Sequence, residues 1–396
     1  MSHFISTTLT TFLTRVYGAY SPEAPLPLHA PQFNQYAETL VLATLRSTFV
    51  SSVGVFVSEF EQGIARFTGS PYAIATVNGT SALHLCCLLA GVQRKDYVLT
   101  QPLTFVATCN AIAYTGATPL FVDTCPQTFG LCPTALQAFL EAFAFKDSDG
   151  TCRLNNTKRV IRACVVMHTL GHPARIKELL SVCEHWGITL IEDAAESLGS
   201  VYEEQHTGTF APLAAISFNG NKILTTGGGG MVLCREAHIA QRAKHLSTTA
   251  KQAHPWAFIH DEVGYNYRLP NLNAALGVAQ LTELPQLLEA KRALAQAYQS
   301  LPLPDGFAWV QEPERCRSNY WLNTLQCPSE ADRNQLLESL TASGVQARPV
   351  WELMPRLPMF AHTHTEASLP LSIPHAIHSS ETLLNLPSSP QAVLAD

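Results

Sequence analysis

The sequence predicts an α/β fold: a large domain with a mostly parallel central sheet between helices, and a smaller C-terminal α+β domain. From about Tyr72 onward, short apolar runs of strand length alternate with helical segments, an order typical of parallel sheets. A long helical tract over 272–301 follows the last of these runs, and the remainder has the length of a small domain. A chain of 396 residues is also too long for one ordinary domain.

The elements follow from hydrophobic periodicity and from the turn residues between the runs. Two helices are expected before the sheet, at 36–45 and 57–67. The expected strands are 73–77, 97–100, 119–122, 162–167, 188–191, 214–218 and 230–233. The expected helices among them are 82–89, 107–114, 133–143, 175–186 and 194–198. We place a proline-bearing N-terminal extension at 1–35, the large α/β domain at 36–270 and the small α+β domain at 271–396.

Composition excludes several classes of protein. A formal net charge of -6 without a long basic run disfavours nucleic acid and acidic membranes as partners. The eleven cysteines form no C-x-x-C pair, so we expect buried free thiols in a reducing cytoplasm and no metal site. No signal peptide or membrane span is recognised, which predicts a soluble cytoplasmic protein. A charged fraction of only 14% suggests surface buried against another subunit.

Polar residues follow the expected strands where ligands bind in such sheets. Asp193 comes just past the apolar run 188–191, and a cap of the helix expected at 194–198 is an equal alternative for it. Glu196 lies three residues further, so one helical turn would place both carboxylates on one face. Lys222 stands in a polar, glycine-punctuated turn after 214–218, where the alternative is a solvated loop lysine. His168 ends another strand and, as a lone histidine, is more often structural.

Two further features complete the candidate site. Gly79, Thr80 and Ser81 lie between a strand and a helix, where backbone N–H groups, hydroxyls and the helix dipole favour an anion. The alternative for the two hydroxyl residues is that they are simple helix caps. Phe105 is a candidate flat surface for a ring, although by itself it is more often a core residue.

These features match the four demands of one cofactor, pyridoxal phosphate (PLP). It needs a lysine that binds it covalently, a carboxylate for its pyridine nitrogen, an anion site for its phosphate and a flat group against its ring. Lys222, Asp193, the 79–81 turn and Phe105 meet these demands in turn. A carboxylate beside the pyridinium keeps the ring nitrogen protonated.

Five stretches of the chain resemble the DegT/DnrJ/EryC1/StrS sugar aminotransferases, which have PLP fold type I. The similarity runs from about residue 27 to 388, and its motifs are 78–83, 104–108, 191–196, 217–222 and 264–269. The resemblance implies that Lys222 is the Schiff-base lysine, Asp193 the pyridinium partner and Phe105 the stacking residue. The residues that resemble phosphate ligands are Thr80, Ser81 and Ser217.

The resemblance also implies a shared active site. Asn266 resembles a phosphate ligand that the family donates from the other subunit, so a homodimer is expected. Some relatives replace the lysine with histidine and become dehydratases, and Lys222 argues against that chemistry here.

One departure concerns the substrate. The family often has glutamine where this chain has Glu196, and a carboxylate facing the cofactor's phenolate must share a proton or serve the substrate. A subset with this glutamate aminates C4 of nucleotide-linked 4-keto-6-deoxy-N-acetylhexosamines, on routes to legionaminic acid or bacillosamine. The segments 167–173, 206–210 and 318–323 most resemble the legionaminic-acid branch. A UDP-linked sugar is favoured over a GDP-linked one.

The expected reaction is a ping-pong transamination, with L-glutamate leaving as 2-oxoglutarate and a nucleotide-linked keto-sugar receiving the amine. Lys222 moves the proton in both halves. The tentative substrate contacts are His168, His260, Tyr320 and Arg348. A sugar dehydratase or epimerase that uses the same cofactor, and a non-catalytic relative of the family, are the alternatives.

Overall fold

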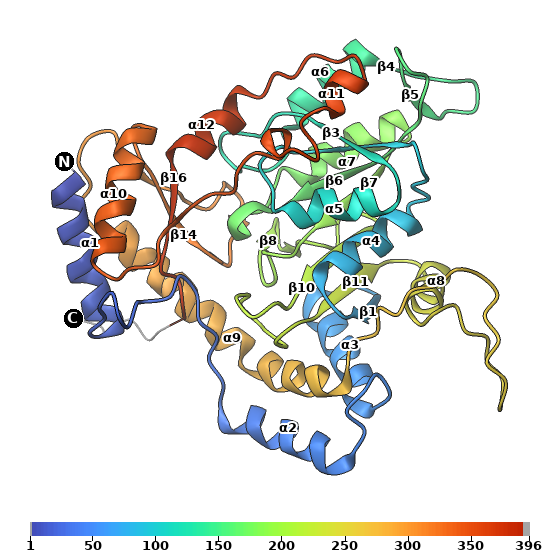
Figure 1. The fold of residues 1–396 in the computed structure, drawn as a ribbon, viewed down its shortest axis with the longest axis horizontal. Helices are drawn as coiled ribbons and strands as arrows, with labels where there is room; N and C mark the ends of the chain where they lie inside the picture. Colours follow the sequence, from blue (N-terminus) through green and yellow to red (C-terminus); the bar gives the residue numbers. More distant parts are fainter. Residues whose placement is uncertain (1, 391–396) are drawn as a thin grey trace.

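The computed structural model describes residues 2–390, and its centre is a seven-stranded sheet (Figure 1). The strands run in the order β1-β11-β10-β7-β6-β2-β3. β11 is antiparallel to its neighbours β1 and β10, and the pairings from β10 to β3 are parallel. The strands are β1 (Tyr72–Thr76), β2 (Tyr97–Thr100), β3 (Thr118–Phe121), β6 (Ile161–Met167), β7 (Thr189–Asp193), β10 (Leu213–Ser217) and β11 (Gly230–Cys234). The predicted mostly parallel sheet is confirmed.

Helices cover both faces of this sheet, which is why its strands are almost uniformly apolar. Alternate strand residues pack on one side against α4, α5 and α8. The other set packs against α6 and α7, and towards the β1 edge against α3 and α9. The helices are α2 (Gln35–Ser47), α3 (Val55–Thr68), α4 (Gly79–Leu89), α5 (Val106–Tyr114), α6 (Pro133–Phe143), α7 (Ile176–Trp186), α8 (Ala237–Ser247) and α9 (Asn271–Gln299).

The long helix α9 leads to a second, antiparallel sheet of order β12-β14-β16-β15 (Figure 1). Its strands are β12 (Ala308–Trp309), β14 (Asn323–Gln326), β15 (Arg348–Pro349) and β16 (Leu383–Leu386). The helices near it are α10 (Glu330–Ala342) and α12 (Pro374–Thr382). The short elements elsewhere are a β4 (Ala144–Lys146) and β5 (Cys152–Leu154) hairpin, β8 (Val201–Tyr202), β9 (Gln205–His206), β13 (Cys316–Arg317), α11 (Thr363–Glu366) and 3-10 turns at Thr169–Gly171 and Met354–Arg356.

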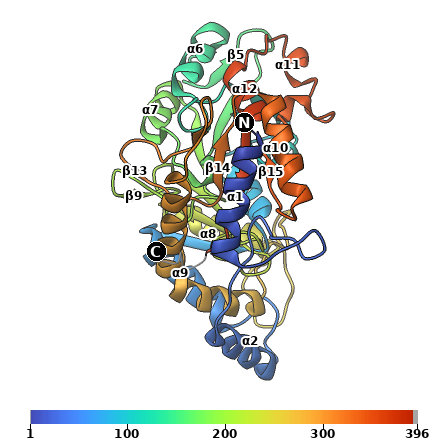
Figure 2. The same ribbon diagram turned by 90° about the vertical axis from the view of Figure 1, so that its left-hand side faces the viewer.

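The N-terminal segment is more than the expected extension, because it contains helix α1 (Ser2–Tyr17). Ile5, Leu9, Phe12 and Leu13 of α1 are buried in the same cluster as residues of α10 and β16. Figure 2 shows α1 beside α10 at the second sheet. The threonine-rich composition conceals an apolar stripe whose spacing is that of a helix face.

The helix expected at 194–198 is wrong. The segment instead forms two successive turns, in which Ser197 N–H donates to Ala194 O and Ser200 N–H donates to Ser197 O. The side-chain amide of Asn319 donates to the carbonyls of Glu196 and Leu198, which a continuing helix would have used internally.

The cysteines and the helices bear on two other expectations. All eleven cysteines lie in the described part of the chain and are free thiols, nine of them buried. None of the helices within 2–390 combines the length and the apolarity that crossing a membrane requires.

Candidate active site

A cavity of about 350 Å³ opens where β7 and β10 end and α4 begins. This is the edge of a parallel sheet at which ligands bind. The predicted site residues that line it are Gly79, Thr80, Phe105, Asp193, Glu196, Ser217 and Lys222. Four separate segments of the sequence are therefore brought together around one cavity.

Lys222 projects from the turn that follows β10, where its N–H donates to Asn219 O. Only 14% of its side chain is exposed. The Nζ atom lies 3.5 Å from Glu196 Oε1 and 3.9 Å from the centre of the Trp321 ring. Burial lowers the pKa of Lys222, although the charges of Glu196 and Asp193 oppose this effect. A lysine with a lowered pKa is the form suited to nucleophilic and acid–base work.

Asp193 ends β7 and is buried at the floor of the cavity. Thr108 Oγ1 donates to Oδ2 at 2.7 Å, and Ala195 N–H donates to Oδ1 at 3.2 Å. Burial raises the pKa of Asp193, and these two hydrogen bonds oppose the rise. The carboxylate is thus fixed in orientation and would gain from a cationic ligand in the cavity.

Glu196 lies beside Lys222 in the first turn after Asp193. Leu170 N–H donates to its Oε2 at 2.9 Å, and Leu170 has a positive φ of 60° that turns this N–H inward. Burial raises the pKa of Glu196 to about 7, while the positive charge of Lys222 opposes the rise. A carboxyl group with this pKa can exchange a proton near neutrality.

Replacement of Glu196 by glutamine should change how stability depends on pH. The folded pKa of about 7 lies above the ordinary value of 4.5, so between these values the folded state keeps a proton that the unfolded chain releases. Stability therefore falls as pH rises through this window, and E196Q escapes the loss. Relative to the parent, the variant should gain about 3 kcal/mol across the window. Urea unfolding of the cofactor-free proteins at the two ends of this pH window measures the free energy of unfolding of the parent and of E196Q. The same difference between the two proteins at both pH values would contradict the prediction.

The anion cradle is formed by the start of α4 and the end of β10. Asn78 caps α4, and its Oδ1 accepts from Ser81 N–H at 2.8 Å. A Cβ atom on Gly79 would lie only 2.8 Å from Ser217 Cβ, so the close approach of the two segments requires glycine. Gly79, Thr80 and Ser217 face the cavity, whereas Ser81 is buried and does not line it.

Replacement of Gly79 by alanine should weaken binding of the phosphate-bearing cofactor about 10-fold to 100-fold, because the added methyl group forces the cradle apart. Spectroscopic titration with PLP measures the affinity. Gly228→Ala is the matched control, since a Cβ there meets nothing within 4 Å. Equal affinities for the two variants would show that the close packing at Gly79 is irrelevant to the ligand.

Aromatic side chains form another part of the cavity wall. Phe105 precedes α5, is half exposed, and meets the Trp351 ring edge-on at 6.4 Å between centres. Trp321 and Trp351 also line the cavity, although neither was predicted as a site residue. The available signal was that Trp321 lies in the segment 318–323 and Trp351 lies close to Arg348.

Two tentative substrate residues are corrected, because both are buried outside the cavity. His168 uses both ring nitrogens: Nε2 lies 3.0 Å from Glu192 Oε2, and Nδ1 accepts from Ala174 N–H. The hydroxyl of Tyr320 accepts from Glu312 N–H at 3.1 Å. His168 and Tyr320 therefore support the structure and have no free group near the site.

The other candidates lie on the surface of the protomer. Arg348 is exposed on β15, and His260 is exposed with Nδ1 2.7 Å from Thr249 O. Asn266 is also exposed, and its Oδ1 accepts from the Arg268 guanidinium at 3.0 Å. None of these three residues lines the cavity of its own protomer.

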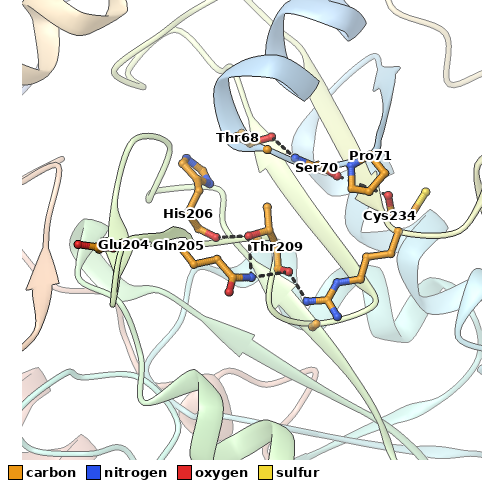
Figure 3. Close-up of a pocket in the computed structure, with 12 residues that line it drawn as sticks. Thr68, Ser70, Pro71, Glu204, Gln205, His206, Thr209 and Cys234 are labelled. Atoms are coloured by element: carbon orange, nitrogen blue, oxygen red, sulfur yellow. Dashed lines mark hydrogen bonds between the residues drawn. The ribbon is translucent and has the colours of Figure 1, made fainter.

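A second cavity, of about 510 Å³, lies at the opposite edge of the sheet, beside the end of the antiparallel strand β11 (Figure 3). Its polar groups bond mainly to one another. Gln205 and Arg235 donate to Thr209 O, and Nε2 of His206 accepts from Gly199 N–H. It contains none of the predicted site residues, so its greater volume does not make it the active site.

The fold and the cavity define a PLP-dependent transferase of fold type I. The DegT/DnrJ/EryC1/StrS aminotransferase family model matches residues 32–396, and the chain belongs to this family, whose members are PLP-dependent. It is 34% identical to the protein named pyridoxal phosphate-dependent aminotransferase EpsN of Bacillus subtilis, over 84% of this chain and 83% of that protein. It is 31% identical to GDP-perosamine synthase of Escherichia coli O157:H7, over 86% and 88% respectively.

A solved structure gives the same result. The aminotransferase TlmJ of Streptoalloteichus hindustanus superimposes with a TM-score of 0.82 at 25% identity, covering 94% of each chain. The protein is therefore a sugar aminotransferase that uses PLP. The names of these two relatives and of TlmJ do not include legionaminic acid, so that finer assignment stays a prediction.

Proposed function

We propose that this enzyme transfers the amino group of L-glutamate to C4 of a nucleotide-linked 4-keto-6-deoxy-N-acetylhexosamine, with Lys222 as the catalytic lysine. The observation that carries the proposal is the meeting of Lys222, Glu196 and Asp193 in one cavity beside an anion cradle. A lysine with a lowered pKa and a carboxyl group with a raised one are suited to proton transfer.

The residues present fit PLP. The cradle of Gly79, Thr80 and Ser217 suits its phosphate, because a Cβ at Gly79 would fill the space. Asp193 would pair with the ring nitrogen, and Phe105 would lie against the ring. When bound, the cofactor supplies an electron sink that makes the hydrogen on the donor's amino-bearing carbon acidic.

The chain itself supplies the acid and the base. Lys222 would take the proton from the donor's carbon and return it at a second position, since its Nζ is partly desolvated and mobile on a four-carbon stem. Glu196 holds or releases a proton 3.5 Å away, which keeps the net charge beside Lys222 low. Trp321 and Trp351 contribute aromatic surface to the cavity wall.

Three segments support a 6-deoxy-N-acetylhexosamine of the legionaminic-acid type as substrate. The segments 167–173, 206–210 and 318–323 resemble that branch, and each contacts the turns that follow Asp193. Leu170 N–H donates to Glu196, and Thr207 Oγ1 donates to Ser197 O. Asn319 holds two carbonyls of the same turns. The branch-like segments thus converge on the wall that contains Glu196.

A GDP-linked 4-keto sugar is the second candidate, because several relatives are named GDP-perosamine synthases. Assays with UDP-linked and GDP-linked 4-keto-6-deoxy sugars, following 2-oxoglutarate release and the NMR spectrum of the product, separate the two. We expect the larger kcat/KM with the UDP-linked N-acetylated sugar. Preference for the GDP-linked sugar would replace the first candidate by the second. Amination at a carbon other than C4 would contradict both.

We further propose a homodimer whose partner donates Asn266. Support comes from two exposed apolar regions, in the loop before Asn266 and beside α2. Trp256 and Phe258 are 81% and 80% exposed, and Phe49 and Val53 are 61% and 68% exposed. Patches of this kind mark protein contacts, and a second copy would cover them.

Mixing two inactive variants tests the shared site. If Asn266 acts across the dimer, a heterodimer of Lys222→Ala and Asn266→Ala protomers has one site with both residues intact. Random pairing should then restore roughly a quarter of the parent activity. Each variant alone, refolded in the same way, is the control. No recovery in demonstrated heterodimers would place Asn266 and Lys222 in the same protomer's site or make Asn266 irrelevant.

A further inference from the structure

The indole ring of Trp321 forms a surface under the amine of Lys222. Nζ lies 3.9 Å from the ring centre, and the ring lines the cavity. Trp321 lies between β13 and β14, so it reaches the site from the second part of the chain, about a hundred residues after the lysine. It is buried, and nothing in the reaction as proposed so far uses its contact with the amine.

Three hydrogen bonds fix this ring, each from a different segment. The main-chain N–H of Trp321 donates to Asn319 Oδ1 at 2.8 Å. Its carbonyl accepts from Lys291 Nζ at 2.7 Å, and its indole Nε1–H donates to Asn221 O at 2.8 Å. Asn221 directly precedes Lys222, so the ring is tied to the turn that carries the lysine.

The side chains that hold Trp321 are buried polar groups, whose removal from water costs free energy. Lys291, on α9, is fully buried and, within residues 2–390, its Nζ donates to the carbonyls of Trp321 and Ser388. Asn319 is also buried, and its amide nitrogen holds the carbonyls of Glu196 and Leu198. Asn319 therefore links the position of the ring to the position of Glu196. Burying such polar groups costs desolvation free energy, and here their hydrogen bonds hold the main chain of Trp321 and the turns after Asp193 in place.

We propose that Trp321 is a positioning residue that holds the amine of Lys222 beside Glu196 whenever the lysine is not bonded to the cofactor. This rests on the proposed role of Lys222. In a transamination the lysine is released and must act from a defined place, although its flexible stem has many rotamers. A cation over an aromatic face in a partly desolvated site is attracted to the ring, and Glu196 attracts it on another side.

Chemical labelling of Lys222 tests the contact without any turnover. The full-length protein, freed of cofactor, is treated with limiting acetic anhydride across a pH range, and peptide mass spectrometry gives the pKa of Lys222. Because the ring favours the charged amine, Trp321→Leu should lower this pKa by about one unit. Below both pKa values, Lys222 would then label about tenfold faster. In Trp321→Phe, the pKa of Lys222 should lie between its values in Trp321→Leu and in the parent.

Trp351→Leu is the matched control, because Trp351 lines the same cavity but contacts Phe105. Its Lys222 profile should equal that of the parent. A pKa in Trp321→Leu that equals or exceeds the parent's, or an equal drop in Trp351→Leu, would overturn the proposal. Circular dichroism confirms folding, and Trp321→Phe preserves the test if the leucine variant does not fold. Failure of the proposed function is a separate result, since it would show as a parent enzyme without glutamate-dependent amination.

Discussion

Replacement of Lys222 by alanine should lower kcat/KM for amino transfer by at least about 10³-fold. The variant loses the group that bonds to the cofactor and that carries the proton in both half-reactions. Nζ of Lys222 lies beside Glu196 inside the cavity and so has the environment this work requires. Coupled detection of 2-oxoglutarate with the parent's keto-sugar substrate gives the rate.

The matched control is Lys177→Ala, which removes a surface lysine that pairs with Glu203. It should retain the parent rate. Borohydride reduction of the PLP-loaded parent should attach the cofactor to the peptide that contains Lys222, and the alanine variant should remain unlabelled. A Lys222→Ala enzyme with a tenth or more of the parent rate would show that another group carries the chemistry.

The parts of the site that the sequence predicted are those set by local rules. Lys222 and Asp193 follow buried strands, and parallel strands bring their ends to one edge of the sheet. Gly79 lies where two segments of backbone approach closely. The structure shows that the second segment is the one that contains Ser217. The predicted strand positions were confirmed because continuous apolar runs that alternate with helical segments have few other arrangements.

The missed features depend on contacts between distant segments. His168 ends a strand as Asp193 does, but in the structure its ring meets Glu192 of the adjacent β7. The turns after Asp193 replace a helix because Asn319, about 120 residues later, takes the carbonyls. Trp321 was not predicted as a site residue, because no local pattern shows that its ring lies against a lysine amine.

Replacement of Asp193 by asparagine should lower kcat/KM by about 10²-fold or more, with little loss of stability. In the isosteric amide, Oδ1 can still accept from Ala195 N–H, while Nδ2 can donate to Thr108 Oγ1, whose hydroxyl can turn to donate to Thr104, so the change removes mainly the charge. A buried charge that is held in a fixed orientation beside a cationic ring accounts for a loss of this size. Burial raises the pKa of Asp193, which means that the ionised group destabilises the cofactor-free fold. The free energy of unfolding of cofactor-free D193N should therefore equal or exceed the parent's.

A comparison with Asp123 distinguishes the cofactor-binding role of Asp193 from helix capping, which is the alternative for an aspartate that follows a strand. Asp123 is also buried just after a strand, and its carboxylate accepts from the N–H groups of His375 and Ala376 at the start of α12. Asp123→Asn should lose about 0.5–2 kcal/mol of stability and keep its turnover per folded molecule. Asp193→Asn should keep or gain stability and lose turnover per folded molecule. If both variants lose stability to the same extent and Asp193→Asn retains turnover, Asp193 is a structural residue. If Asp123→Asn loses only stability and Asp193→Asn loses only turnover, Asp193 is assigned to the cofactor.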